Sequence, residues 1–339
     1  MIQEEKIKQC LRELVDTDSD IYNYATPKGL KELRVNIAKY LDKKLNSKVN
    51  ENNILITSGS QQSIYLLSRV LSNQGDTIAS EEPTFFGAIA VFKEIGVEVL
   101  TVEINDDGIN LNELREKISS SHPKFIYVVP TFHNPTGISW DNTQRKDFLK
   151  IINEYGVTVI EDDPCSELNY TDDDFKTLYE LNEGKNIIYL GTFSKLICPS
   201  LSVGYILADN AIIERLYEYK LLNDMNTSLF IQKFVNLYLE KYNIVEDIAM
   251  KKAQYQKNAR LIKEKLSNEF DNISFSNMRG GLFMTVNIPK SVQPTSPYDT
   301  NHYDARMQDF IRADVSKANI DELVDTINIK YKLKKRSTS

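Results

Sequence analysis

Short apolar runs rich in β-branched residues alternate with stretches of helical period through the first two thirds of the chain. The clearest runs are Ile54–Thr57, Phe125–Val129, Val157–Ile160 and Ile187–Leu190. Apolar runs without internal alternation indicate strands buried on both faces, and helices between them indicate crossover connections. The sequence therefore predicts an α/β fold with a mixed, mostly parallel sheet sandwiched by helices.

Beyond about residue 210 this alternation gives way to long amphipathic helices, including one at 247–270. Short strands are expected near 273–275 and 282–286, followed by a polar loop at 289–304. A chain of 339 residues can bury one large core and a smaller one. We expect three parts: 1–44 as a dimer arm and the N-terminal part of a small domain, 45–245 as a large domain, and 246–339 as a shortened C-terminal α+β small domain.

Composition excludes several classes of partner and site. A net charge of -7 argues against a nucleic-acid-binding surface. The three cysteines form no CxxC pair and the three histidines are isolated, so we expect no metal site and no disulfide framework. No apolar run approaches the roughly 20 residues of a membrane helix, and the N-terminus lacks the order of a signal peptide. We expect a protein of the reducing cytoplasm.

One strand leads into a lysine. Ile187–Leu190 runs into Gly191-Thr-Phe-Ser-Lys195, a turn of mainly small residues. Such a turn places Lys195 at the carboxyl edge of the sheet, where open α/β proteins bind ligands. A partly desolvated amine there can form a Schiff base with a carbonyl compound. The alternative is an ordinary surface lysine at a strand end.

Three other segments follow strands in the same way. Thr57–Gln62 is either a helix N-cap or a phosphate site made of backbone amides and hydroxyls. Glu82–Gly87 offers aromatic rings that either join the core or lie on a planar ligand. Asn134–Gly137 is either a simple turn or a place where an asparagine amide donates to a phenolate oxygen.

Three consecutive acids, Glu161, Asp162 and Asp163, end a further strand. They are consistent with a solvated turn, with a magnesium site, or with a single carboxylate beneath a pyridine nitrogen. At about 3 Å and an effective dielectric near 20, the last pair interacts by roughly 5 kcal/mol before desolvation. That energy is enough to keep a pyridine nitrogen protonated.

Taken in order, these segments resemble the fold-type-I pyridoxal phosphate enzymes. The resemblance is narrower to the class I/II aminotransferases, in the branch of the 2-aminoadipate aminotransferases and the aminotransferase domain of MocR-type regulators. It covers nearly the whole chain and is carried by Tyr24–Gly29, Thr57–Gln62, Glu82–Gly87, Asn134–Gly137, Glu161–Leu168, Gly191–Lys195, Asn226–Gln232, Gly280–Phe283 and Phe310–Arg312.

The resemblance implies roles for individual residues. Lys195 would be the Schiff-base lysine of pyridoxal 5'-phosphate and would move the substrate α-proton. Asp162 would pair with the pyridine nitrogen, Asn134 with the ring oxygen, and Phe85 would stack on the ring. The residues expected around the phosphate are Gly59, Ser60, Gln61, Thr192 and Ser194.

Two more residues complete the implied site. Arg312 would grip the substrate α-carboxylate with a two-pronged bond suited to guanidinium geometry. Tyr24 would reach the phosphate from the neighbouring subunit of a homodimer with a shared active site. The implied function is an aminotransferase acting on an amino acid and a 2-oxo acid. The alternatives are a lyase, racemase or decarboxylase on the same cofactor, or a non-catalytic binding protein.

The chain departs from the family pattern at three places. Ser202 stands where the family carries a phosphate-binding arginine, and Pro164 and Cys165 stand where it carries a tyrosine. Cys165 is interpreted as a core filler or as a thiol near the cofactor. The loop at 289–304 takes the place of part of the small domain, so Arg306 competes with Arg312 for the carboxylate role. These departures motivate the non-catalytic alternative.

Overall fold

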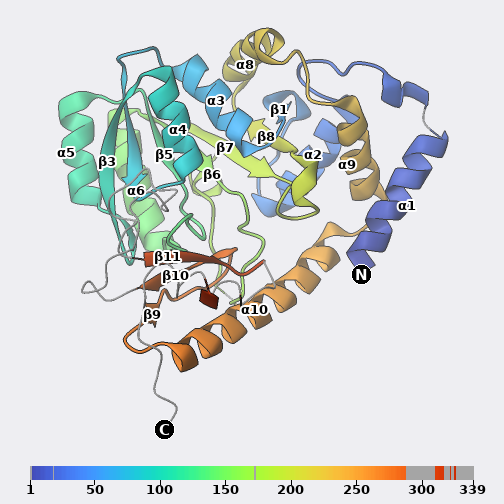
Figure 1. Cartoon of the computed structure of the whole chain (residues 1–339). Helices are drawn as coiled ribbons and strands as arrows, with labels where there is room; N and C mark the ends of the chain where they lie inside the picture. Colours follow the sequence, from blue (N-terminus) through green and yellow to red (C-terminus); the bar gives the residue numbers. More distant parts are fainter. Residues whose placement is uncertain are drawn as a thin grey trace.

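The computed structural model describes residues 2–17, 19–171, 173–287, 310–316, 321 and 324–325. Its centre is an eight-stranded sheet (Figure 1), in which β3, β2, β5, β6 and β7 are parallel neighbours and antiparallel pairs flank them. The predicted α/β fold with a mixed, mostly parallel sheet is confirmed. In spatial order the strands are β1 (Ile54–Thr57), β8 (Gly204–Leu207), β7 (Ile187–Thr192), β6 (Thr158–Asp162), β5 (Phe125–Val128), β2 (Thr77–Glu82), β3 (Glu98–Asn105) and β4 (Gly108–Ile109).

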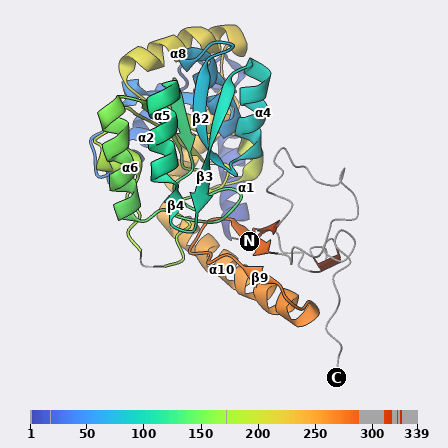
Figure 2. The same cartoon turned by 90° about the vertical axis from the view of Figure 1, so that its left-hand side faces the viewer.

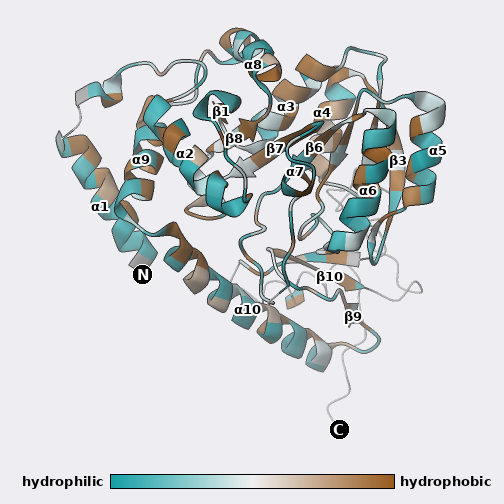
Figure 3. Cartoon of the chain, turned by 180° about the vertical axis from the view of Figure 1, so that it is seen from behind, coloured by the Kyte–Doolittle hydropathy of each residue, from teal (hydrophilic) through white to brown (hydrophobic). Residues whose placement is uncertain are grey.

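Helices cover both faces of the sheet, because successive strand residues point to opposite sides. Ile160 and Ile188 pack into the core under α3, α4 and α8, whereas Val159 and Ile187 pack into the core under α5, α6 and α7. Figure 3 shows α6 as mainly hydrophilic on its outer side, with hydrophobic strands behind it. The bounds are α3 (Ser60–Leu71), α4 (Phe86–Ile95), α5 (Leu111–Ser121), α6 (Asn142–Tyr155), α7 (Leu178–Leu181) and α8 (Asn210–Asn223).

The N-terminal helices lie beside β1 and β8. Cys10 and Leu14 share a buried core with Leu33, Ile37 and Phe234, which joins α1, α2 and α9. None of the described helices is both long and apolar enough to cross a membrane. The elements of this region are α1 (Ile2–Thr17), η1 (Ser19–Tyr22), α2 (Lys31–Lys44), η2 (Glu51–Asn53), η3 (Pro199–Leu201) and α9 (Leu229–Lys241).

The long helix α10 (Ile244–Glu269) runs from this region to a second, three-stranded sheet (Figure 2). That sheet has the order β11 (Phe310–Asp314), β10 (Phe283–Asn287), β9 (Ser274–Phe275), and both of its pairs are antiparallel. Its core residues pack on the second half of α10. The short strands expected near 273–275 and 282–286 are present. The loop expected at 289–304 and Arg306 lie outside the described residues, and the division at 44 and 245 stays a prediction.

Candidate active site

A cavity of about 410 Å³ lies where the carboxyl ends of the central strands face the small sheet. Open α/β sheets bind ligands at this edge. The structure brings together every predicted site residue except Tyr24. The lining residues are Ser58, Gly59, Ser60, Gln61, Phe85, Phe86, Val129, Asn134, Asp162, Pro164, Cys165, Thr192, Ser194, Lys195, Ser202, Leu282, Phe283, Arg312 and Asp314.

One end of the cavity is the N-terminus of α3. Gly59 precedes the helix with φ 93°, a left-handed conformation that favours glycine, and no side chain caps the helix. The interpretation of 57–62 as a self-capped helix start is therefore wrong. Free amides and the positive end of the helix dipole suit a phosphate. The side-chain amide of Gln61 donates to the Gly87 carbonyl at 2.8 Å, so the group that Gln61 can offer to a phosphate is its backbone amide.

A buried lysine contacts the first turn of α3. Lys220 Nζ donates to Gln62 Oε1 at 3.0 Å and pairs with Asp224 at 2.8 Å. The same Gln62 oxygen accepts from the Ser58 amide at 2.8 Å. Lys220 is fully buried, and burial lowers its pKa while Asp224 opposes that shift. Sequence reasoning missed Lys220, because it lies inside α8, 158 residues from Gln62, with no motif around it.

The three acids at the end of β6 have separate surroundings. All three are at most 4% exposed, so the interpretation as a solvated turn is wrong. Glu161 accepts from the backbone amides that begin α7, at 2.8 and 2.9 Å. Asp163 accepts from Tyr189 and Ser166 and pairs with Lys44. Across the described part of the chain, no cluster of His, Cys, Asp or Glu is placed to hold a metal ion.

Asp162 alone of the three lines the cavity. Its Oδ2 accepts from Tyr127 Oη at 2.6 Å, whereas its Oδ1 is buried and has no hydrogen-bond partner among the described residues. Burial raises the pKa of Asp162 to about 7, although the Tyr127 bond works against the shift. A buried carboxylate oxygen without a donor is costly. A protonated ring nitrogen is the kind of group that removes this cost.

The part of the cavity wall that belongs to the small sheet carries an arginine. Arg312 Nη1 donates to Asn134 Oδ1 at 2.9 Å, which leaves the Asn134 NH₂ group free of that bond. The Arg312 guanidinium lies 4.6 Å from the centre of the Phe283 ring. Phe85 meets Phe86 edge to face, with ring centres 5.1 Å apart. Arg312 lies on β11, where it is paired with Thr285 of the neighbouring strand β10. Its side chain lines the cavity.

Lys195 lies in a turn directly after β7. The Thr192 hydroxyl donates to the Val203 carbonyl at 2.9 Å and accepts from the Ser194 amide at 3.1 Å, which fixes the start of this turn. Cys165 is 1% exposed, and burial raises the pKa of its thiol. A buried, protonated thiol is a poor nucleophile. Cys165 packs in the core and also lines the cavity, so both interpretations, core filler and thiol near the cofactor, stay open.

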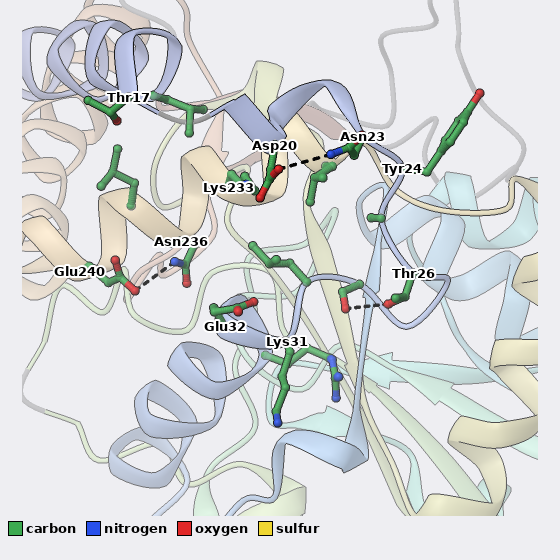
Figure 4. A pocket seen from close by; sticks show the side chains of 17 residues that line it. Thr17, Asp20, Asn23, Tyr24, Thr26, Lys31, Glu32, Lys233, Asn236 and Glu240 are labelled. Atoms are coloured by element: carbon green, nitrogen blue, oxygen red, sulfur yellow. Dashed lines mark hydrogen bonds between the residues drawn. The ribbon is translucent and has the colours of Figure 1, made fainter.

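Tyr24 is not part of this cavity within a single chain. It lies beside a separate pocket of about 840 Å³ between η1, α2 and α9, and its side chain is 87% exposed. Figure 4 shows the Tyr24 ring pointing away from Asp20, Lys31 and the other polar residues of that pocket. Its predicted contact with a phosphate therefore requires a second chain.

The chain is similar to proteins of known family. Residues 3–327 match the family described as aminotransferase class I and II. The chain is 32% identical to aromatic-amino-acid aminotransferase 1 of Thermococcus litoralis over 79% of this chain and 66% of that protein. It is 29% identical to 2-aminoadipate transaminase of Thermus thermophilus over 86% of this chain and 72% of that protein. The chain thus spans about two thirds of the length of these relatives.

A solved structure with the same fold contains a bound ligand. The alpha-aminoadipate aminotransferase LysN of Thermus thermophilus, complexed with N-(5'-phosphopyridoxyl)-L-leucine, matches with a TM-score of 0.85 and 25% identity, over 96% of this chain and 87% of that one. The orphaned Asp162 oxygen, the uncapped helix and the nearby lysine fit pyridoxal 5'-phosphate, which is the cofactor. The chain belongs to the class I and II aminotransferases.

Proposed function

We propose that this protein is an aminotransferase that moves an amino group between an amino acid and a 2-oxo acid. The observation that carries the proposal is the unpartnered, buried Oδ1 of Asp162 in the same cavity as Lys195. When bound, pyridoxal phosphate supplies an aldehyde that takes up the amino group and a ring that withdraws electrons.

Four residues of the cavity have separate roles toward the cofactor in this proposal. The Lys195 amine holds the cofactor covalently and, once released by substrate, moves the proton of the substrate α-carbon. Asp162 accepts a hydrogen bond from the protonated ring nitrogen and balances its charge. The Asn134 amide donates to the ring oxygen, and Phe85 covers one face of the ring.

The two ends of the cavity bind anions. The backbone at Gly59, Ser60 and Gln61 holds the phosphate together with the Thr192–Ser194 turn, and Arg312 binds the substrate α-carboxylate. The hydrogen bond to Asn134 and the Phe283 ring orient Arg312 for this task.

The rest of the cavity favours substrates with apolar or aromatic side chains. Its remaining wall includes Val129, Phe86, Leu282 and Phe283, and Asp314 adds a negative charge that repels an acidic side chain. The name of the Thermococcus relative, an aromatic-amino-acid aminotransferase, points in the same direction.

The proposal includes a homodimer with shared active sites. Tyr22 and Tyr24 are 81% and 87% exposed, and Leu222 at the end of α8 is 85% exposed. Tyr22 and Tyr24 lie two residues apart, and a second chain that covered them would bring Tyr24 to the site its predicted role requires. A location in the reducing cytoplasm is part of the same proposal and is supported by the three free cysteines.

The test uses the full chain with added pyridoxal phosphate. We expect cofactor absorbance that shifts when phenylalanine or leucine is added and returns when a 2-oxo acid follows. Glutamate and 2-aminoadipate serve as acidic comparisons, and Lys195→Ala should abolish the covalent form. A spectral change with release of ammonia or carbon dioxide instead would favour a lyase or decarboxylase. Cofactor binding without turnover for any donor would support the non-catalytic alternative, which Ser202 motivates.

A further inference from the structure

Lys195 sits in an isolated helical turn. The Ile197 amide donates to the Phe193 carbonyl at 2.8 Å, which closes one turn, and the next helical element is the three-residue η3 (Pro199–Leu201). The last carbonyls of a helical segment lack partners within the segment. A single turn is also too short to be stable by itself. The position of Lys195 therefore depends on groups outside the turn.

Two side chains from distant helices supply those groups. Lys251 Nζ, on α10, donates to the Ile197 carbonyl at 2.9 Å and makes a longer contact of 3.4 Å with the carbonyl of Lys195 itself. Gln3, on α1, donates to the Leu196 carbonyl at 3.2 Å. A cation is favourable at the C-terminal end of a helical turn, where carbonyl dipoles gather. Lys251 is the stronger of the two ties because it carries a charge and reaches two carbonyls.

Helix α10 also holds the strand of the substrate arginine. The Asn258 side chain, buried in α10, donates to the Val315 carbonyl at 2.9 Å, just beyond β11 and three residues from Arg312. Lys251 and Asn258 are seven residues apart, which is about two turns and about 10 Å along one face of the helix. One rigid helix face thus contacts both the lysine turn and the arginine strand.

We propose that Lys251 is a positioning residue that holds the Lys195 turn on α10, so that this helix sets the placement of Lys195 relative to Arg312. The inference rests on the proposed function of those two residues. Among the described residues, the hydrogen bonds of Lys251 go to backbone carbonyls, and Lys251 lies outside the cavity lining, so it acts through Lys195. Its removal should slow the chemistry of Lys195 while leaving the phosphate end of the site intact.

The probe is pyridoxal phosphate, with the full chain at pH 7. The Lys195 amine condenses with the cofactor aldehyde and releases water, and borohydride then reduces the C=N bond to a stable adduct for mass spectrometry. Burial lowers the pKa of Lys251 to about 8, although the neighbouring Cys198 and Asp247 oppose this shift, so the ammonium form prevails at pH 7. In Lys251→Met we expect the saturating rate of adduct formation to fall about tenfold, and the half-saturating cofactor concentration to change less than about twofold.

Two variants control this measurement. Lys251→Arg keeps a cation and should restore most of the rate. Lys252→Met removes the same charge from the next residue of α10, and Lys252 makes no hydrogen bond to the turn among the contacts of the described residues. It should leave the rate unchanged. In the cofactor-free chain, amide hydrogen exchange of residues 193–198 should quicken in Lys251→Met and not in Lys252→Met.

An unchanged rate and unchanged exchange in Lys251→Met would overturn the inference, as would an equal loss in Lys252→Met. A fall in melting temperature without a fall in the saturating rate would make Lys251 merely structural. If the unaltered chain itself forms no adduct at Lys195, the proposed function fails instead. The exchange of residues 193–198 then still decides whether Lys251 holds the turn.

Discussion

Replacing Asp162 by asparagine should stabilise the cofactor-free chain and disable the loaded one. Burial raises the pKa of Asp162 from 3.8 to about 7, so the folded chain holds this proton more tightly than the unfolded chain. Stability is therefore lost as the pH rises from about 4 to about 7, and the loss is complete above that window. Each pH unit of the window is worth about 1.4 kcal/mol, so the ionised carboxylate costs about 4 kcal/mol at pH 8.

The asparagine variant avoids that cost but buries an amide in its place. The Tyr127 hydroxyl can still donate to the new carbonyl oxygen, whereas the NH₂ group meets the position where Oδ1 lacks a partner. An unpaired buried amide costs about 1–3 kcal/mol. The net gain at pH 8 is then about 1–3 kcal/mol, and it should shrink by about 3 kcal/mol between pH 8 and pH 5.

Urea unfolding of the cofactor-free chain at pH 5, 6, 7 and 8 measures this difference directly. Asp163→Asn is the matched control, because Asp163 is equally buried but paired with Lys44 at 3.0 Å, and its pKa is lowered. That change should destabilise the chain at pH 8. A free-energy difference between Asp162→Asn and the unaltered chain that does not vary from pH 5 to pH 8 would refute the reasoning. With cofactor, Asp162→Asn should lose most transamination activity.

Three further substitutions test the two ends of the cavity. Ser202→Arg should tighten pyridoxal phosphate binding by about ten- to a hundredfold, since a charged hydrogen bond is worth about 1.5–3 kcal/mol; cofactor retention on dialysis measures this, with the exposed Ser200→Arg as control. Lys220→Met leaves Asp224 without its lysine beside Gln62 and should weaken cofactor binding by about tenfold, as measured by fluorescence titration; unchanged binding would show that the start of α3 needs no positive charge there. Asn258→Ala frees the strand of Arg312 and should raise KM for the amino donor more than it lowers kcat; the reverse pattern in steady-state kinetics would contradict that assignment.

The part of the site that sequence could predict consists of residues at strand ends. Lys195, Asp162 and Asn134 each follow an apolar run, and parallel strands bring their carboxyl ends to one edge. Strand alternation also explains why Asp162 differs from its neighbours. Glu161 and Asp163 point to one side of β6 and find partners there, while Asp162 points to the other side and into the cavity.

The residues that sequence could not predict act across long separations. Tyr127 lies inside a buried strand and has the pattern of a core residue until its hydroxyl is seen on Asp162, 35 residues away. Lys251 is one of five lysines on α10, so composition and periodicity do not single it out. Lys220 is the one lysine of α8, but no motif surrounds it and its partner Gln62 is 158 residues away. Only packing decides which of these cations turns inward.

The buried Lys220 bears on the missing phosphate arginine. Ser202 lines the cavity with a short side chain, and the cationic side chains that line it among the described residues are Lys195 and Arg312. Neither belongs to the phosphate end in the proposed function. Lys220 lies one hydrogen-bonded residue behind that end and neutralises Asp224, so that no unpaired carboxylate faces Gln62 and the start of α3. We therefore expect the proposed phosphate site to depend on backbone amides and on the Lys220–Asp224 pair, so the charge of Lys220 should matter more here than it would beside an arginine at 202.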